Sequence, residues 1–257
     1  MSASTAQRIE WRLATVVDVA VETATTRTLT LDVPGWPGHL AGQHVDVRLT
    51  AEDGYQTERS YSIASPPEDS RLALTIERLE DGEVSSYLCG ELRAGDQFEL
   101  RGPIGGYFVW DVSAGGPLLL VAGGSGIVPL MAMLRHRAAA LPRVEARRAL
   151  PARLLYSSRR WDDVIYRDEL ATMAASDPML GVTHTITREP PPVWTGFRRR
   201  IDRAMLGEVA WPPAERPRIF VCGPTPLVES AATELVALGH DRDLVKTERF
   251  GPTGATA

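Results

Sequence analysis

Arg59 and Tyr61 are the first residues of this 257-residue sequence whose types and spacing could do chemistry. They stand two positions apart in residues 57–65, where side chains alternate with the period of a β-strand. One face of that strand would present a cation beside an aromatic ring. Such a face suits a ligand that has both a phosphate and a flat ring. The alternative is an ordinary strand end, with a solvated arginine and a half-buried tyrosine.

A glycine-rich turn at residues 123–126 follows an apolar run at 118–122 and precedes a segment of helical composition at 127–140. Glycines let the backbone approach a pyrophosphate, and the start of the helix offers free N–H groups and a partial positive charge. Pro129 stands where the usual G-x-G-x-x-G pattern has its last glycine, so the pattern is incomplete. We interpret the turn as a nucleotide-binding loop, with a glycine turn that binds nothing as the alternative.

A second helix start is expected at residues 82–89, where glycine and two serines precede a short apolar face. Backbone N–H groups at such a start can hold an anion, although a plain capped helix would have the same composition. Further along, Cys222 ends an apolar strand and is followed by Gly223 and Pro224. A small, soft cysteine at that edge could lie against a flat nicotinamide ring, whereas Cys89 is expected to be an inert core residue.

Composition excludes several classes of protein. The formal net charge of -5 and the pI near 5.6 argue against nucleic acid as a partner. The two cysteines fall short of the four that an iron–sulfur cluster usually needs, and the five histidines show no metal-ligand spacing. The first 12 residues lack the apolar stretch of a signal peptide, so a cytoplasmic location is expected. The uncharged run at 117–134 is broken by glycines and Pro129, so no membrane span is expected.

The elements that must position these residues fall into two halves. Strands with period-two alternation and turn residues between them predict a small antiparallel β-barrel in the first half. The expected strands lie at residues 14–21, 27–33, 43–49, 57–65, 72–78 and 97–101.

The second half alternates apolar strands with helices, which predicts an α/β doubly wound parallel-sheet domain. Its strands are expected at residues 118–122, 153–157, 182–187 and 218–222, and its helices at 127–140, 166–175, 203–209 and 226–238. We therefore predict a two-domain protein, with a barrel domain at residues 1–112 and an α/β domain at residues 113–257.

Three motifs in this order resemble the ferredoxin–NADP reductase superfamily of flavoproteins: Arg59-Ser60-Tyr61-Ser62, Gly123-Gly124-Ser125-Gly126-Ile127-Val128-Pro129 and Cys222-Gly223-Pro224. The resemblance extends from Trp11 to Phe250 and implies an FAD-binding barrel followed by a nicotinamide-binding domain, without a fused iron–sulfur domain. It implies that Arg59 binds the flavin pyrophosphate, that Tyr61 packs against the flavin, and that Ser62 approaches its reactive N5.

The resemblance also assigns roles to the other segments. The start of the helix at residue 82 becomes a second phosphate-binding segment, and Glu248 on the terminal strand approaches the flavin. The implied catalytic residues are Ser62, Cys222 and Glu248, with a solvated carboxylate as the alternative for Glu248. The implied cofactor-binding residues are Arg59, Ser60, Tyr61, Ser62, Gly82, Val84, Ser85, Ser86, Gly123, Gly124, Ser125, Gly126, Ser158, Arg159, Tyr166, Cys222, Gly223, Pro224 and Phe250.

The choice between NADPH and NADH depends on the end of the second parallel strand. Ser158 and Arg159 stand where NAD-selective sites place an acidic residue, and a hydroxyl with a guanidinium suits a 2′-phosphate. Asp162 and Asp163 nearby leave NADH as the second choice. The resemblance places Tyr166 against the adenine.

We therefore expect an FAD-dependent NAD(P)H oxidoreductase that passes a hydride from NADPH to FAD. Single electrons would then leave for a separate acceptor protein, such as a ferredoxin or another cluster, haem or molybdenum partner. One alternative is a flavin or ferric reductase that acts on small acceptors. Another is a non-catalytic electron-transfer subunit that binds nucleotides.

Overall fold

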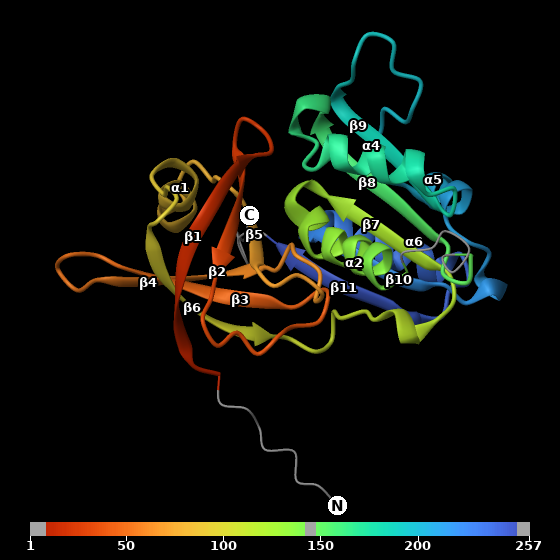
Figure 1. Cartoon of the computed structure of the whole chain (residues 1–257). Coiled ribbons are helices and arrows are strands. Elements are labelled where there is room, and N and C mark those ends of the chain that lie inside the picture. The colour runs from red at the N-terminus through yellow and green to blue at the C-terminus, as the bar shows by residue number, and fades with distance from the viewer. Residues whose placement is uncertain (1–8, 142–147, 251–257) are drawn as a thin grey trace, which may run out of the picture.

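The computed structural model describes residues 9–141 and 148–250, which form two sheets (Figure 1). The first sheet is antiparallel and has the strand order β4-β3-β6-β1-β2-β5. Its strands are β1 (Trp11–Val21), β2 (Thr26–Asp32), β3 (His44–Thr50), β4 (Gln56–Ser62), β5 (Leu72–Glu77) and β6 (Gln97–Ile104). Helix α1 (Glu83–Gly90) lies between β5 and β6 in the chain.

The first sheet closes on itself as the sequence predicts. An antiparallel bridge between Ile63 and Leu74 joins the end of edge strand β4 to edge strand β5. Alternation places Val45 and Val47 of β3 in the barrel core, with their polar neighbours half exposed. Because the barrel is closed at this point, the residues just before Ile63 are held at its rim.

The second sheet is parallel and has the order β11-β10-β7-β8-β9. Its strands are β7 (Leu118–Gly123), β8 (Ala152–Arg160), β9 (Leu180–Glu189), β10 (Arg218–Pro224) and β11 (Val245–Phe250). Its helices are α2 (Ile127–Ala140), α4 (Arg167–Ser176), α5 (Arg203–Val209) and α6 (Thr225–Ala237). These elements confirm the predicted alternation of strands and helices.

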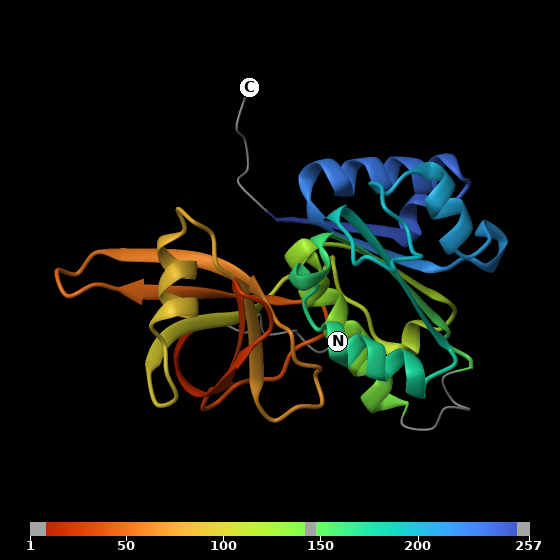
Figure 2. The same cartoon turned by 90° about the horizontal axis from the view of Figure 1, so that it is seen from above.

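Helices cover both faces of the parallel sheet (Figure 2). Leu118 and Leu120 of β7 belong to a core with α2 and α4, whereas Leu119 and Val121 belong to a core with α5 and α6. Buried on both faces, β7 is apolar throughout, which is why its sequence shows no alternation. The result is the doubly wound architecture expected from the sequence.

Helix α2 fixes the parallel-sheet domain to the barrel. Arg135 donates to the carbonyl of Ala64 at 2.7 Å and forms a bidentate ion pair with Glu169 of α4. The next residue, His136, lies 2.7 Å from the carboxylate of Glu68 and 3.2 Å from that of Asp111. Two consecutive residues of one helix thus contact the barrel side of the molecule and the segment that connects the two sheets.

Within the described ranges, no helix is both long and apolar enough to cross a membrane. The same ranges hold no group of three or more histidine, cysteine, aspartate or glutamate side chains placed to bind a metal ion.

Candidate functional site

Two loops interlock at the carboxyl edge of the parallel sheet, where open α/β sheets bind their ligands. A Cβ atom added to Gly126 would lie 2.2 Å from the carbonyl oxygen of Cys222, and one added to Gly223 would lie 3.0 Å from that of Gly123. Gly223 also has a φ of +153°. These glycines are required because the backbones of the two loops touch, a reason that the sequence pattern alone did not indicate.

The glycine loop also leaves room for a ligand. Gly124 has a φ of +53°, a left-handed conformation, and a Cβ atom added there would meet nothing within 4 Å. The loop forms one turn of 3₁₀-helix, Gly124–Gly126, and continues into α2, whose start has no side-chain cap. An uncapped helix start beside an open backbone fits a pyrophosphate.

Cys222 and Glu248 lie opposite each other in neighbouring strands β10 and β11. The Cys222 thiol donates toward Glu248 Oε2 over 4.0 Å. Burial raises the pKa of Cys222 well above its usual range, with a further contribution from Glu248, and burial raises the pKa of Glu248 to about 7. The arrangement is a thiol beside a carboxyl group that can hold a proton near neutral pH. Phe250, at the end of β11, pairs with Pro224.

On the barrel, β4 separates its predicted residues between two faces. Arg59 and Tyr61 pair with Val47 and Val45 of β3, so they stand on the face that those valines share. Arg59 is exposed and donates to the carbonyl of Glu58, whereas Tyr61 packs against the barrel core. Burial raises the pKa of Tyr61, so the phenol stays protonated.

Ser60 stands apart from this pair. Its hydroxyl donates to Asp46 at 2.6 Å, and Asp46 also accepts from Arg101 at 3.0 Å. The Ser60 side chain is therefore committed to a polar cluster on the other face of β4. Its predicted cofactor contact would have to come from the backbone.

Ser62 ends β4 with a hydroxyl that is buried and lacks a hydrogen-bond partner among the described residues. A buried hydroxyl without a partner costs free energy unless something satisfies it. Ser62 therefore fits a site whose missing partner is a ligand with a polar ring atom.

The start of α1 has no side-chain cap, which leaves its first backbone N–H groups available to an anion. The hydroxyl of Ser85 accepts from the Leu79 N–H at 3.1 Å, and that of Ser86 donates to the Leu79 carbonyl at 3.3 Å. Both serines thus hold the preceding loop against the helix. Gly82 is required there, because an added Cβ atom would lie 2.3 Å from Ser85 Oγ.

The end of β8 presents one free guanidinium. Ser158 is buried and Arg159 is exposed, while Arg160 pairs with Glu189 at 3.1 Å. No carboxylate of residues 9–141 or 148–250 forms an ion pair with Arg159. Asp162, which stood as an argument for NADH, lies 3.5 Å from the guanidinium of Arg167.

Tyr166 lies in the contact between the two domains rather than on an open surface. Its side chain is buried, its hydroxyl donates to Thr75 of β5, and the Arg135 guanidinium lies 4.7 Å from the centre of its ring. With the ring enclosed in this way, the geometry supports a structural role. The predicted adenine contact is not supported.

A cluster of aromatic rings that the sequence pattern did not indicate follows the end of β8. Trp161 follows β8, and its ring centre lies 5.3 Å from that of His184 and 5.1 Å from that of Trp194. Burial lowers the pKa of His184 to about 4, so the histidine is neutral at pH 7. Trp161, His184 and Trp194 are far apart in the sequence, so no sequence motif indicated this cluster. Because Trp161 follows Arg159 by two positions in the chain, these rings are candidates for an adenine site.

Comparison with known proteins agrees with this architecture. The sequence model of the oxidoreductase FAD-binding domain matches residues 13–109, and that of the oxidoreductase NAD-binding domain matches residues 120–233. The glycine betaine monooxygenase reductase subunit of Chromohalobacter salexigens is 32% identical over 217 residues, which make up 83% of this chain and 56% of that protein. The chain therefore spans little more than half of that relative.

Two further proteins are similar to this chain. NADH-cytochrome b5 reductase 1 of Neosartorya fischeri is 28% identical over 213 residues, which make up 82% of this chain and 67% of that protein. The structure of a ferredoxin NADP+ reductase from Neisseria gonorrhoeae shares the fold, with a TM-score of 0.75 at 19% identity over 93% of this chain and 98% of that chain.

The two matched domains, one on each sheet, define an oxidoreductase architecture with an FAD-binding barrel and an NAD-binding α/β domain. The chain belongs to the oxidoreductases that combine these two domains, and it has the fold of the ferredoxin–NADP reductase superfamily.

Proposed function

We propose that this protein is a flavoprotein reductase that oxidises NADPH and delivers single electrons to an acceptor protein outside these 257 residues. The observation that carries the proposal is the pairing of Cys222 with Glu248 at the carboxyl edge of the parallel sheet. The relatives named above, a monooxygenase reductase subunit and a cytochrome b5 reductase, support electron delivery to a protein. With only two cysteines in the sequence, a four-cysteine cluster has to be supplied from elsewhere.

Bound FAD would supply the redox chemistry, accepting a hydride and releasing electrons one at a time. Three residues of the chain would surround the reacting rings. The free hydroxyl of Ser62 would satisfy a polar atom of the flavin ring, and the uncharged thiol of Cys222 would support the nicotinamide. Glu248, with a pKa of about 7, would hold or release a proton beside them. Their part is orientation and electrostatics.

Arg59 and the start of α1 would hold the phosphates of FAD. Arg59 is exposed and, among the residues that the structure describes, donates one hydrogen bond, to the backbone carbonyl of Glu58, so its remaining donors are available. The uncapped backbone N–H groups of Glu83, Val84 and Ser85 would add an anion site. The Gly82 turn sets that helix start in place.

NADPH is the proposed donor because of Arg159. An exposed guanidinium without a carboxylate partner suits a 2′-phosphate, and the neighbouring acidic residue Asp162 is engaged by Arg167. Trp161 is proposed as the adenine contact in place of Tyr166. We place the boundary between the domains at residues 112 and 113, in the connection between β6 and β7.

The visible spectrum of the purified protein tests the proposal. Under anaerobic conditions the protein should be yellow, and NADPH should bleach it faster than NADH does. Oxidation by a ferredoxin-type protein, compared with free FMN or ferric citrate, then separates a protein reductase from a reductase of small acceptors. A colourless protein that neither takes up FAD nor bleaches would contradict the enzymatic proposal.

A further inference from the structure

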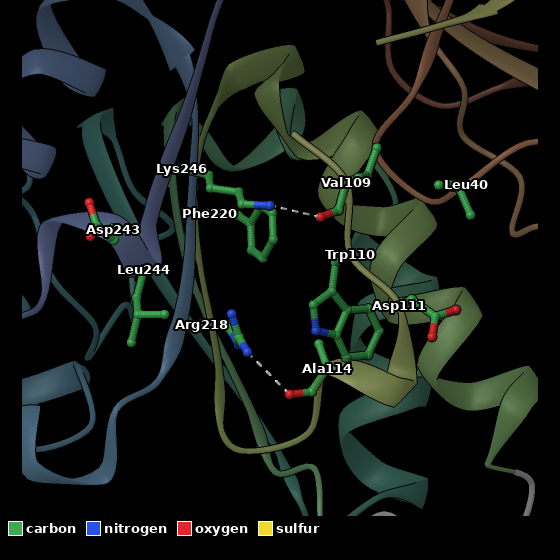
Figure 3. A pocket seen from close by; sticks show the side chains of 10 residues that line it. All are labelled: Leu40, Val109, Trp110, Asp111, Ala114, Arg218, Phe220, Asp243, Leu244 and Lys246. Carbon is green, nitrogen blue, oxygen red and sulfur yellow. Dashed lines mark hydrogen bonds between the residues drawn. The ribbon is translucent and has the colours of Figure 1, made fainter. Parts of the chain in front are cut away.

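A pocket of about 220 Å³ lies where the connection between the two domains crosses strands β10 and β11 (Figure 3). We call it the linker pocket. It is lined by Leu40, Val109, Trp110, Asp111, Ala114, Arg218, Phe220, Asp243, Leu244 and Lys246. Three of these residues, Arg218, Phe220 and Lys246, come from the first halves of their strands, away from the carboxyl edge described above.

Three nitrogen donors converge on the linker pocket. Lys246 Nζ donates to the carbonyl of Val109, and Arg218 donates to that of Ala114, each over 3.4 Å. These bonds use one donor of each cation. The Nε1 of Trp110 is buried and has no hydrogen-bond partner in the described part of the chain. In Figure 3 this nitrogen lies on the side of the indole that faces Arg218.

The positive charge of the two cations is not balanced inside the linker pocket. No carboxylate of the described residues forms an ion pair with Arg218 or Lys246. Asp111 is occupied elsewhere, because one of its oxygens accepts from Ser113 and the other lies 3.2 Å from His136. Asp243 is exposed, and its carboxylate points away from the two cations (Figure 3).

Partial burial, and to a lesser extent the charge of the nearby Arg218, lower the pKa of Lys246, as expected for two cations that face one pocket. An anion between them would balance their charge and satisfy the Trp110 N–H. Charge and an unsatisfied buried donor are independent observations, and both point to the same missing group.

The walls of the linker pocket are apolar. The Trp110 indole and the Phe220 ring face the space together with Leu40 and Leu244. At about 220 Å³ the pocket is smaller than the roughly 300–1,000 Å³ typical of drug-sized ligands, so its ligand must be small. An inorganic anion would satisfy the donors but leave the rings without a partner.

We propose that the linker pocket binds a small aromatic carboxylate, with the carboxylate held by Arg218, Lys246 and Trp110 and the ring held between Trp110 and Phe220. This site goes beyond the proposed reductase function and does not depend on it.

The linker pocket is separate from the site at the carboxyl edge but is joined to it through the sheet. Phe220 pairs with Lys246, and two residues further along the same strands Cys222 pairs with Glu248. Residues two apart on a strand share a face and lie roughly 7 Å apart. A ligand in the linker pocket would therefore bind the connecting segment and the two strands that present Cys222 and Glu248.

Calorimetric titration of the FAD-loaded protein tests the proposal with three probes. Benzoate has both the ring and the charge, benzyl alcohol has the ring alone, and inorganic phosphate has the charge alone. We expect saturable one-to-one binding of benzoate, and at least ten-fold weaker binding of the other two. Arg218→Gln and Lys246→Gln should each weaken benzoate binding at least ten-fold.

Arg242→Gln is the matched control, because it removes a cation from an exposed position just before β11 that does not line the linker pocket. It should leave benzoate binding unchanged. Trp110→Phe keeps an aromatic wall but removes the N–H donor, and it should weaken binding several-fold; it decides the matter if either charge variant fails to fold. The proposal is overturned if benzoate does not bind, if Arg218→Gln and Lys246→Gln leave binding intact, or if phosphate binds as tightly as benzoate.

Discussion

The carboxylate of Glu248 lies 4.0 Å from the Cys222 sulfur across strands β10 and β11, and the two groups differ in the pH at which they lose a proton. Cys222 keeps its proton at neutral pH, because burial and the nearby carboxylate both disfavour a thiolate. Glu248 is half-buried, and the desolvation of its carboxyl group raises its pKa to about 7. The pair thus combines an uncharged thiol surface with a group that titrates in the working range of pH.

The raised pKa of Glu248 should make folding stability depend on pH. The carboxyl has a pKa of about 7 when folded and 4.5 as its ordinary value, so the folded state binds the proton more tightly. Its contribution to stability is full below pH 4.5 and is lost as the pH rises through 7. When the pH is raised from 5.5 to 8, the loss of this contribution should lower the free energy of unfolding by about 2 kcal/mol. Urea unfolding at the two pH values measures the change.

Glu248→Gln should abolish that part of the pH dependence, because the amide does not titrate. Glu229→Gln is the control, since Glu229 is exposed and pairs with Arg249 at the surface. If the wild-type protein and Glu248→Gln changed in parallel between pH 5.5 and pH 8, the raised pKa would be wrong.

Arg59→Ala should reduce FAD retention. Hydrogen bonds to charged groups contribute about 1.5–3 kcal/mol, so the Kd for FAD should rise about ten- to a hundred-fold. The fold should be unaffected, because the exposed Arg59 side chain donates only to the neighbouring Glu58 carbonyl. Fluorescence titration of the apoprotein with FAD measures the change. Arg71→Ala, which alters an exposed arginine just before β5, should retain FAD as the wild type does.

Much of the fold could be predicted from the sequence because its signals are local. The alternation around Val45 and Val47 and the unbroken apolar run of β7 follow directly from burial on one face or on two. The turn expected at the glycine-rich residues 123–126 is also present, as one turn of 3₁₀-helix at Gly124–Gly126. These features depend on residues that are close together in the chain, so the sequence pattern is sufficient to predict them.

The surroundings of the site depend on contacts between distant residues, and these could not be predicted. Tyr166 bonds to Thr75, which is 91 positions away, so nothing near Tyr166 in the sequence indicated that its ring would be enclosed. Trp161 and Trp194 lie far apart in the sequence, and the contact between their rings depends on the path of the loop that carries Trp194. The hydrogen bond from the Ser60 hydroxyl could not be predicted either, because its partner, Asp46, lies on another strand.

Arg159→Ala should change the preference between the two nicotinamide cofactors. The KM for NADPH should rise about ten- to a hundred-fold, through loss of a charge-assisted contact to the 2′-phosphate, while the KM for NADH should stay within about two-fold. Steady-state reduction of ferricyanide measures both constants. Arg160→Ala is the matched control, because the neighbouring arginine is held by Glu189. An equal rise in both KM values would remove Arg159 from the phosphate site.

Trp161 and Tyr166 make opposite predictions about adenine. Trp161→Ala should raise the KM for NADPH and for NADH by a similar factor of about ten, since stacking on a base contributes roughly 1–3 kcal/mol and both cofactors carry adenine. Tyr166→Phe should leave both KM values unchanged. It should instead lower the free energy of unfolding by about 0.5–1.5 kcal/mol, because the buried Thr75 hydroxyl loses one of its two partners and keeps the bond to Thr28. Kinetics and urea unfolding of the two variants separate the roles. A higher KM in Tyr166→Phe with unchanged stability would restore Tyr166 to the nucleotide site and remove it from the domain contact.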